Sequence, residues 1–103
     1  MNALRMARRL GVRVEIADLG AWGDSALNAE YDPHGPTIRV NVRRLREMAP
    51  FRRREFVAHA VGHELFHHLE ATGAAPRPRK SAARERAAEA FAKTLAASVP
   101  LLP

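Results

Sequence analysis

Five consecutive residues, His63-Glu64-Leu65-Phe66-His67, join two imidazoles and a carboxylate at a spacing that suits metal chemistry. On a helix, residues four apart are offset by about 40° around the axis and one turn along it, so His63 and His67 can reach one ion. Glu64 projects about 100° from His63 and can hydrogen-bond a water molecule on that ion. Zinc lowers the pKa of such a water toward about 7, and the Glu64 carboxylate can take its proton. The spacing therefore predicts attack of an activated water on a peptide carbonyl.

A third ligand is needed, because catalytic zinc usually has three protein ligands and an open position for water. The chain has no cysteine, so this ligand must be a histidine or a carboxylate. The metzincin arrangement is excluded, because it requires glycine at position 70 and histidine at position 73, where this chain has Glu70 and Gly73. Two later glutamates, Glu85 and Glu89, lie one helical turn apart and remain as candidates.

Glu85 is the glutamate that we expect to face the rest of the protein. It lies on the border of an apolar stripe formed by Ala88, Phe91, Ala92 and Leu95. The alanines of this stripe permit close approach to another helix. Three basic residues of the same helix can face water: Arg84, Arg86 and Lys93. A solvated surface position is the competing interpretation for Glu85, and more so for Glu89.

Hydrophobic spacing predicts the elements that carry these side chains. Residues 2–10 have helical spacing, and Gly11 follows as the residue that ends the helix. From position 12 to position 16, valine and isoleucine alternate with charged residues, which is typical of a half-buried strand. Residues 18–24 carry two glycines and a tryptophan and are expected to form a loop.

Two further segments alternate in the same way. Leu27, Ala29 and Tyr31 form the first, and Ile38, Val40 and Val42 form the second. The residues between them, Asp32-Pro33-His34-Gly35-Pro36, are dense in turn formers. We therefore expect an antiparallel hairpin that joins the first strand in a sheet of three strands, which is the usual minimum for a stable sheet.

The histidine motif lies in a segment that is expected to be a central helix. Residues 51–70 contain no proline and have a wide apolar face, and Pro50 stands where helices often begin. Residues 72–80 hold one glycine, two prolines and three basic residues, and are expected to be an exposed loop. Ser81 can cap the next helix, which we expect over about residues 81–98.

Composition narrows the class of protein. At 103 residues, the chain is expected to form one domain over residues 1–103 with one core. Arginines at positions 5, 8 and 9 interrupt the apolar stretch near the N-terminus, so neither a signal peptide nor a membrane span is expected, and a cytoplasmic location is the default. A formal net charge of +6 invites nucleic-acid binding, but the arginines are spread over every segment instead of one stripe, so we do not favour it.

Four segments resemble the ImmA/IrrE family of metallopeptidases, over nearly the whole chain. LGVRVEI resembles the end of the family's opening helix and its first strand, YDPHGPTIRVN its hairpin with a strand ending in asparagine, and FVAHAVGHELFHHL its zinc helix. The most specific segment is ERAAEAFAKTL, which begins at Glu85. Counted from this glutamate, alanine follows three residues later, Phe-Ala six and seven residues later, and leucine ten residues later. The chain departs from the family where LAASVP replaces the usual Leu-Leu-Met-Pro and where Glu89 replaces a common asparagine.

The resemblance implies that Glu85 is the third zinc ligand beside His63 and His67, and that Glu64 is the catalytic base. The expected elements define an α+β protein, and the resemblance implies a minimal zincin-like fold in which a small three-stranded sheet, antiparallel in part, packs on the central helix and a C-terminal helix. The implied activity is that of a gluzincin-like zinc endopeptidase that makes limited cuts in a regulatory protein, such as a repressor or an antitoxin. The oligomeric state and the choice of zinc over another divalent metal stay open.

Other side chains can assist at such a site. His59 lies one turn before His63, and His68 follows the motif. Either can orient a ligand, hydrogen-bond a substrate carbonyl or lie satisfied at the surface, and we favour the surface for His68. Tyr31 and His34, near the hairpin turn, can donate to an oxyanion. An exposed sheet edge beside the cleft would suit a peptide that adds as an extra strand.

A protein of a different class is compatible with the same residues. It would be a catalytically inactive, metal-stabilised binding or regulatory module that engages nucleic acid or an acidic protein. The two hypotheses differ at Glu64, which is the base of the enzyme and is dispensable for the binding module.

Overall fold

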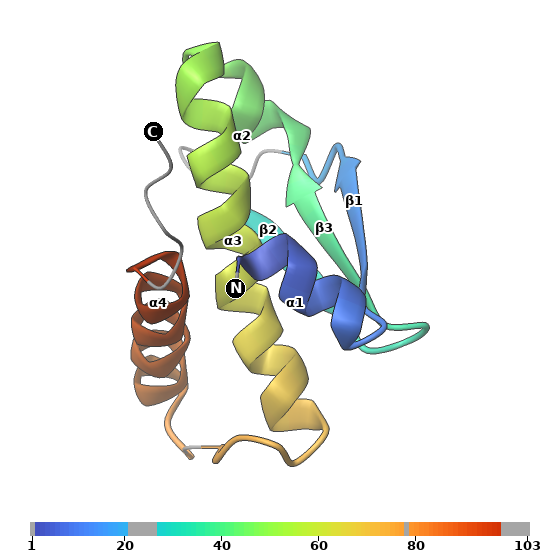
Figure 1. The fold of residues 1–103 in the computed structure, drawn as a ribbon, viewed down its shortest axis with the longest axis vertical. Helices are drawn as coiled ribbons and strands as arrows, with labels where there is room; N and C mark the ends of the chain where they lie inside the picture. Colours follow the sequence, from blue (N-terminus) through green and yellow to red (C-terminus); the bar gives the residue numbers. More distant parts are fainter. Residues whose placement is uncertain (1, 21–26, 78, 98–103) are drawn as a thin grey trace.

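The structure, a computed structural model, describes residues 2–20, 27–77 and 79–97, and its elements combine helices and strands in an α+β arrangement. In chain order they are α1 (Ala3–Arg9), β1 (Arg13–Ala17), β2 (Ala29–Asp32), β3 (Thr37–Asn41), α2 (Val42–Arg46), α3 (Pro50–Ala71) and α4 (Ser81–Ala97). Helix α3 lies between the sheet on one side and α4 on the other (Figure 1). Most of the loop expected over 18–24 lies outside the described residues. None of the described helices is long and apolar enough to cross a membrane.

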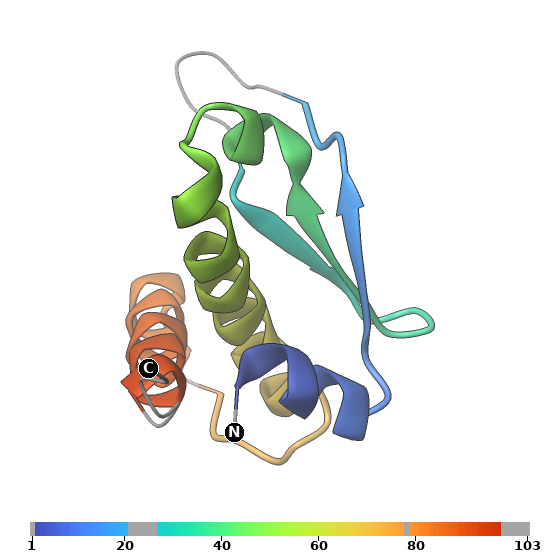
Figure 2. The ribbon, with the colours of Figure 1, turned by 45° about the horizontal axis from the view of Figure 1, so that its top comes forward.

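The strands form one mixed sheet in the order β1-β3-β2. Strands β2 and β3 are antiparallel, with Tyr31 opposite Ile38, which confirms the predicted hairpin. Strand β1 runs parallel to β3, with Val14 opposite Ile38, and nothing in the sequence pattern indicated this pairing. Strand β2 is therefore an edge strand, and it is the strand nearest to α3 in Figure 2.

The sheet has a buried face and a solvated face, because side chains alternate along a strand. Ile38 and Val40 of β3 are fully buried in the core. On the opposite face, the guanidinium of Arg39 lies within 3.5 Å of three carboxylates from the neighbouring strands, those of Glu15, Glu30 and Asp32. This cross-strand pairing explains the charged residues that alternate with the apolar ones.

Helix α1 packs across α3, and its end lies beside the start of β1 (Figure 2). Its first turn is capped by Asn2, whose side chain accepts a hydrogen bond from the Arg5 N–H at 2.8 Å. Gly11 follows its end with φ of 72°, as expected for a residue that ends a helix. Val12 is buried, but Ile16 is 51% exposed, so the expected half-buried pattern fails at the far end of β1.

Asn41 links the sheet to the chain segments around it. Its fully buried side chain accepts the N–H of Leu19 at 3.2 Å and donates to the carbonyls of Gly20 and Leu27, at 3.2 and 2.8 Å. It also caps α2, so Val42, which the alternation assigned to the strand, is the first residue of a helix instead. One buried amide thus holds the chain on both sides of residues 21–26.

Helix α4 packs on α3 through small residues, as the alanine stripe predicted. Ala88 is fully buried and Ala92 is 2% exposed. A Cβ atom added to Gly62 would lie 3.3 Å from the Cα atom and 3.4 Å from the Cβ atom of Ala92. Gly62 therefore lets the two helices approach closely enough for glutamates on α4 to reach histidines on α3.

The ends of α3 match the sequence prediction better than the start of α4 does. Pro50 occupies the first turn of α3, and Gly73 follows its end with φ of 80°. The described residues of the 72–80 loop are mostly exposed, as expected. Ser81 is not the cap of α4, because the Arg84 N–H donates to the carbonyl of Lys80 at 3.1 Å and Lys80 therefore holds the cap position.

Gly62→Val is expected to lower the free energy of unfolding by about 1–3 kcal/mol, because the added side chain must push α4 away from α3. Urea and thermal unfolding followed by circular dichroism would measure the change. Ala82→Val, at an exposed position of α4, is the matched control and should cost less than about 1 kcal/mol. Equal losses in the two variants would contradict the close contact at Gly62.

Candidate metal centre

Helices α3 and α4 bring together the three residues that the sequence predicted as metal ligands. The carboxylate of Glu85 lies 2.8 Å from Nε2 of His63 and 3.3 Å from Nε2 of His67. One nitrogen or oxygen atom of each residue lies within 4.8 Å of those of the other two. The imidazoles are largely buried, whereas 55% of the Glu85 side chain is exposed, so the point where the three converge can be reached from solvent.

The second nitrogen of each imidazole is held by a different carboxylate. Nδ1 of His63 lies 2.6 Å from Glu89, and Nδ1 of His67 lies 2.7 Å from Glu70. With the Nδ1 protons donated to these carboxylates, Nε2 of each ring presents a lone pair toward Glu85. A cation between these lone pairs and the carboxylate would be held by all three groups, and in its place a second proton on His63 can bridge to Glu85. Imidazole nitrogens and a carboxylate oxygen are zinc ligands, and carboxylates commonly orient such rings, so these residues fit zinc.

The electrostatics of the site favour positive charge. Burial acts to lower the pKa of His63, but the hydrogen bond to Glu89 and the nearby charges of Glu64 and Glu85 outweigh it, so the pKa is raised above its usual value. The same carboxylates that stabilise a protonated imidazole also stabilise a cation bound in place of the proton.

Glu64 lines a cavity of about 220 Å³ beside the converging side chains. His63 and Glu85 also line this cavity, which we call the metal cavity, and residues 27–29 at the start of β2 form its opposite wall. Burial raises the pKa of Glu64 to about 7, although the charges of the two motif histidines oppose the rise. Without an ion, Glu64 would therefore exchange a proton near neutral pH, and a cation held by His63, His67 and Glu85 would favour the carboxylate form that a general base requires.

Glu89 lies outside the point of convergence and supports it. One carboxylate oxygen contacts Nδ1 of His63, and the other lies 3.0 Å from Nε2 of His59. Burial acts to raise the pKa of Glu89, but the hydrogen bonds to His63 and His59 outweigh it, so the pKa is lowered. The sequence left open whether Glu89 replaces or assists Glu85, and the geometry favours assistance. His59 reaches the same network and also lines the metal cavity.

Glu70 is a site residue that the sequence reasoning missed. Its side chain is only 1% exposed, and it contacts His67 and the guanidinium of Arg84, whose Nε lies 3.3 Å away. Burial acts to raise the pKa of Glu70, but the hydrogen bonds from His67 and Arg84 outweigh it, so the pKa is lowered. The signal was an acidic residue three positions after His67, the spacing at which side chains of one helix meet.

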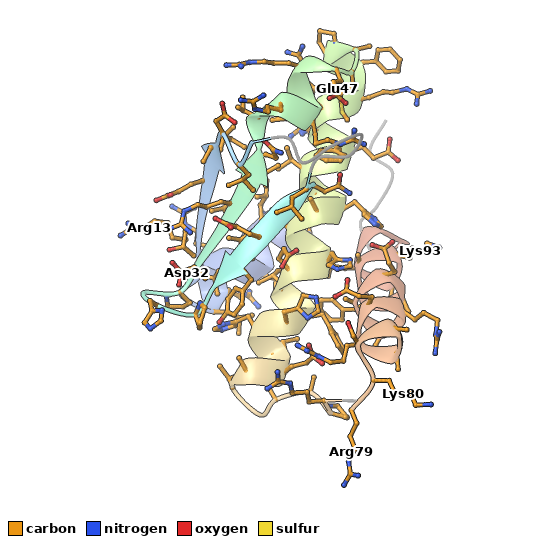
Figure 3. The ribbon with its side chains drawn as sticks, turned by 180° about the vertical axis from the view of Figure 1, so that it is seen from behind. Arg13, Asp32, Glu47, Arg79, Lys80 and Lys93 are labelled. Carbon is orange, nitrogen blue, oxygen red and sulfur yellow. The ribbon has the colours of Figure 1, made fainter. Side chains whose placement is uncertain are left out.

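The prediction that three basic residues of α4 face water holds for two of them. Lys93 is exposed and points away from α3 in Figure 3, as predicted, and Arg86 is exposed as well. Arg84 is instead half-buried against Glu70, so the prediction that it faces water is wrong. It neutralises a carboxylate that would otherwise be costly to bury.

The other residues that the sequence suggested as assistants at the site differ in burial. His68 is 7% exposed and is hydrogen-bonded through Nδ1 to the hydroxyl of Tyr31 at 2.7 Å, so the surface position predicted for it is wrong. Burial lowers the pKa of His68 and, together with the charge of Asp32, raises the pKa of Tyr31. This pair joins β2 to α3. His34 stands on the hairpin turn with its side chain 95% exposed and contacts Asp32.

The fold and the site together define the class of protein. A small mixed sheet packed on a helix that carries His-Glu-x-x-His, with a glutamate supplied by the following helix, is a minimal zincin-like metallopeptidase fold. The chain belongs to the family of the IrrE N-terminal-like domain, a peptidase family of zinc-dependent type, whose model matches residues 7–103. This match confirms the ImmA/IrrE resemblance of the sequence. No curated protein and no solved structure gives a significant match to the chain.

Glu70→Ala is expected to weaken zinc binding by about 10–100-fold, because His67 loses the carboxylate that orients its ring. It should also lower the free energy of unfolding by about 1–3 kcal/mol, because Arg84 loses its buried partner. Competition with a chromophoric chelator measures the first effect, and urea unfolding measures the second. Glu55→Ala, at an exposed position of the same helix, is the control and should change neither. Unchanged zinc affinity in Glu70→Ala would contradict the orienting role.

Proposed function

We propose that the protein is a gluzincin-like zinc endopeptidase in which His63, His67 and Glu85 hold one zinc ion and Glu64 is the general base. The observation that carries this proposal is the convergence of two Nε2 atoms and a Glu85 oxygen on one point, with Glu64 in the adjoining cavity. Membership of a peptidase family supports the same reaction class.

The reaction follows from what each side chain can do. Zinc, when bound, polarises a peptide carbonyl and makes water acidic enough to be deprotonated near neutral pH. Glu64 accepts the proton of the attacking water and then delivers it to the nitrogen of the leaving amine. Glu89 and Glu70 hold the two imidazoles in the orientation that points Nε2 at the ion.

The edge of β2 offers main-chain groups for holding an extended substrate. The Asn41 N–H donates to the carbonyl of Asn28 at 2.9 Å, so the alternation of an antiparallel ladder directs the main-chain groups of Ala29 and Tyr31 to the open edge. Ala29 lines the metal cavity, and Tyr31 lines a neighbouring cavity of about 250 Å³ together with His67. A peptide that pairs antiparallel with β2 would cross the converging ligands.

The substrate that we propose is a polypeptide, and the family resemblance points to a regulatory protein such as a repressor or an antitoxin. The rival hypothesis, a binding module without activity, is favoured only by the net charge of +6. It predicts salt-sensitive association with nucleic acid that survives both Glu64→Gln and removal of the metal.

Glu64→Gln is expected to retain one zinc per chain and to lower kcat/KM for peptide cleavage by about 10²–10⁴-fold, because the amide cannot accept a proton. Zinc content by atomic absorption and cleavage of a proteome-derived peptide library by the zinc-loaded protein are the measurements. Wild-type turnover in the variant would show that Glu64 is not the base.

Glu85→Ala and Glu89→Ala are expected to differ in metal binding. Loss of Glu85 removes a ligand, so the purified variant should hold less than one zinc per chain. Loss of Glu89 removes only the partner of Nδ1, so one zinc should remain with affinity reduced by about 10–100-fold. Metal analysis and chelator competition compare the two variants. The reverse order would exchange the roles of the two glutamates.

A further inference from the structure

A second cavity lies further along α3 than the metal cavity. It is the cavity of about 250 Å³ that Tyr31 and His67 line, and we call it the His67 cavity. The metal cavity takes its α3 residues from positions 59–64, whereas the His67 cavity takes them from positions 67–71. Arg77 of the loop after α3 and Arg84 of α4 complete the wall beside His67. One motif histidine stands in the wall of each cavity, so both cavities adjoin the candidate metal centre.

The charges in the wall of the His67 cavity do not cancel. Glu70 is the one acidic residue among the described residues of this wall, and its side chain is 1% exposed. It is held by His67 and by Arg84, so the charge of Arg84 is balanced within the wall. Arg77 is exposed and, among the residues that the structure describes, is paired with no carboxylate. The wall therefore presents one unbalanced positive charge.

The neighbouring carboxylates do not supply the missing partner. Asp32 follows Tyr31 in the chain, but successive side chains of a strand project to opposite faces, so Asp32 faces the other side of the sheet. There its carboxylate lies 3.4 Å from the guanidinium of Arg39. Glu85 faces Nε2 of His63 and lines the metal cavity instead. A carboxylate from outside the described chain would therefore be the partner of the guanidinium in the His67 cavity.

The direction of β2 indicates which part of a substrate reaches the His67 cavity. Ala29, at the start of β2, lines the metal cavity together with Glu64, whereas Tyr31 lines the His67 cavity. A peptide that pairs antiparallel with β2 passes Tyr31 first and Ala29 second, so residues before the cleaved bond lie at the His67 cavity. Two residues of a strand span about 7 Å, so the cavity lies roughly one to three positions before that bond.

We propose that the His67 cavity is a substrate subsite in which Arg77 binds the carboxylate of an aspartate or glutamate, roughly one to three positions before the cleaved bond. The proposal rests on the proposed peptidase function and adds the class of sequence that the enzyme selects. Its physical basis is a cavity beside a metal ligand whose wall holds one guanidinium without a partner. Such a guanidinium can bind both oxygens of a carboxylate.

The test compares two matched variants, Arg77→Gln and Arg79→Gln. Each removes one positive charge from the same exposed loop. Only Arg77 lines the His67 cavity, whereas Arg79 points away from α3 and α4 in Figure 3. Zinc-loaded wild type and both variants are incubated with a proteome-derived peptide library at low ionic strength, where charge pairs are least screened. The new termini are sequenced by mass spectrometry.

Wild type and Arg79→Gln should favour Asp or Glu over Asn or Gln at the predicted positions by about 3–10-fold, and Arg77→Gln should lose this preference. Arg77→Glu should reverse it in favour of Lys or Arg. Three results would overturn the proposal: no acidic preference in wild type, equal preferences in Arg77→Gln and Arg79→Gln, or an acidic preference confined to positions after the cleaved bond.

A binding measurement separates this proposal from the proposed function. Zinc-loaded Glu64→Gln protein, alone and combined with either loop substitution, is mixed with a random decapeptide pool, and the retained peptides are sequenced. Enrichment of acidic peptides that disappears with Arg77→Gln and persists with Arg79→Gln supports the subsite even if wild type cleaves nothing, in which case only the peptidase function fails. If Arg77→Gln weakens binding of a DNA duplex more than Arg79→Gln does but leaves the peptide enrichment unchanged, the cavity has a different occupant and the proposal is wrong.

Discussion

A helix that carries imidazoles and carboxylates through the middle of a small protein is stable only if each buried polar group has a partner. In α3, His63 is held by Glu89, His67 by Glu70, and Glu70 in turn by Arg84. No buried side-chain nitrogen or oxygen atom lacks a hydrogen-bond partner among the residues that the structure describes. The candidate metal centre is therefore the inner part of a polar network that the fold must close around it, because an unpaired member would be costly to bury.

The closing of this network depends on close approach between helices. Gly62 has no side chain where Ala92 packs against it, so α4 lies near enough to bring Glu85 to Nε2 and Glu89 to Nδ1 of His63. Two glutamates four residues apart on α4 thereby act on the two nitrogens of one imidazole. The other side of α3 is covered by the sheet (Figure 2). Residues 27–29, which lead into the edge strand β2, line the metal cavity.

The arginines of the chain differ in whether the fold pairs them with carboxylates. Arg39 and Arg84 are used within the fold, where each neutralises carboxylates at short distance. Arg52 has no ion pair of this kind among the described residues, and its guanidinium lies 5.8 Å from the centroid of the exposed Phe51 ring.

The sequence by itself determined what depends on spacing within one element. The motif histidines share a face because helical periodicity puts them there, and the hairpin follows from alternation on both sides of a turn. The alanine stripe on α4 predicted the face that packs, and with it the inward position of Glu85. Tertiary structure alone decided the pairing of β1 with β3, the burial of His68 against Tyr31, the contact of Glu89 with His63, and the contact of Arg84 with Glu70. These are contacts between elements, and they depend on interhelical distance, crossing angle and strand order, which the residue pattern of any single helix or strand leaves undetermined.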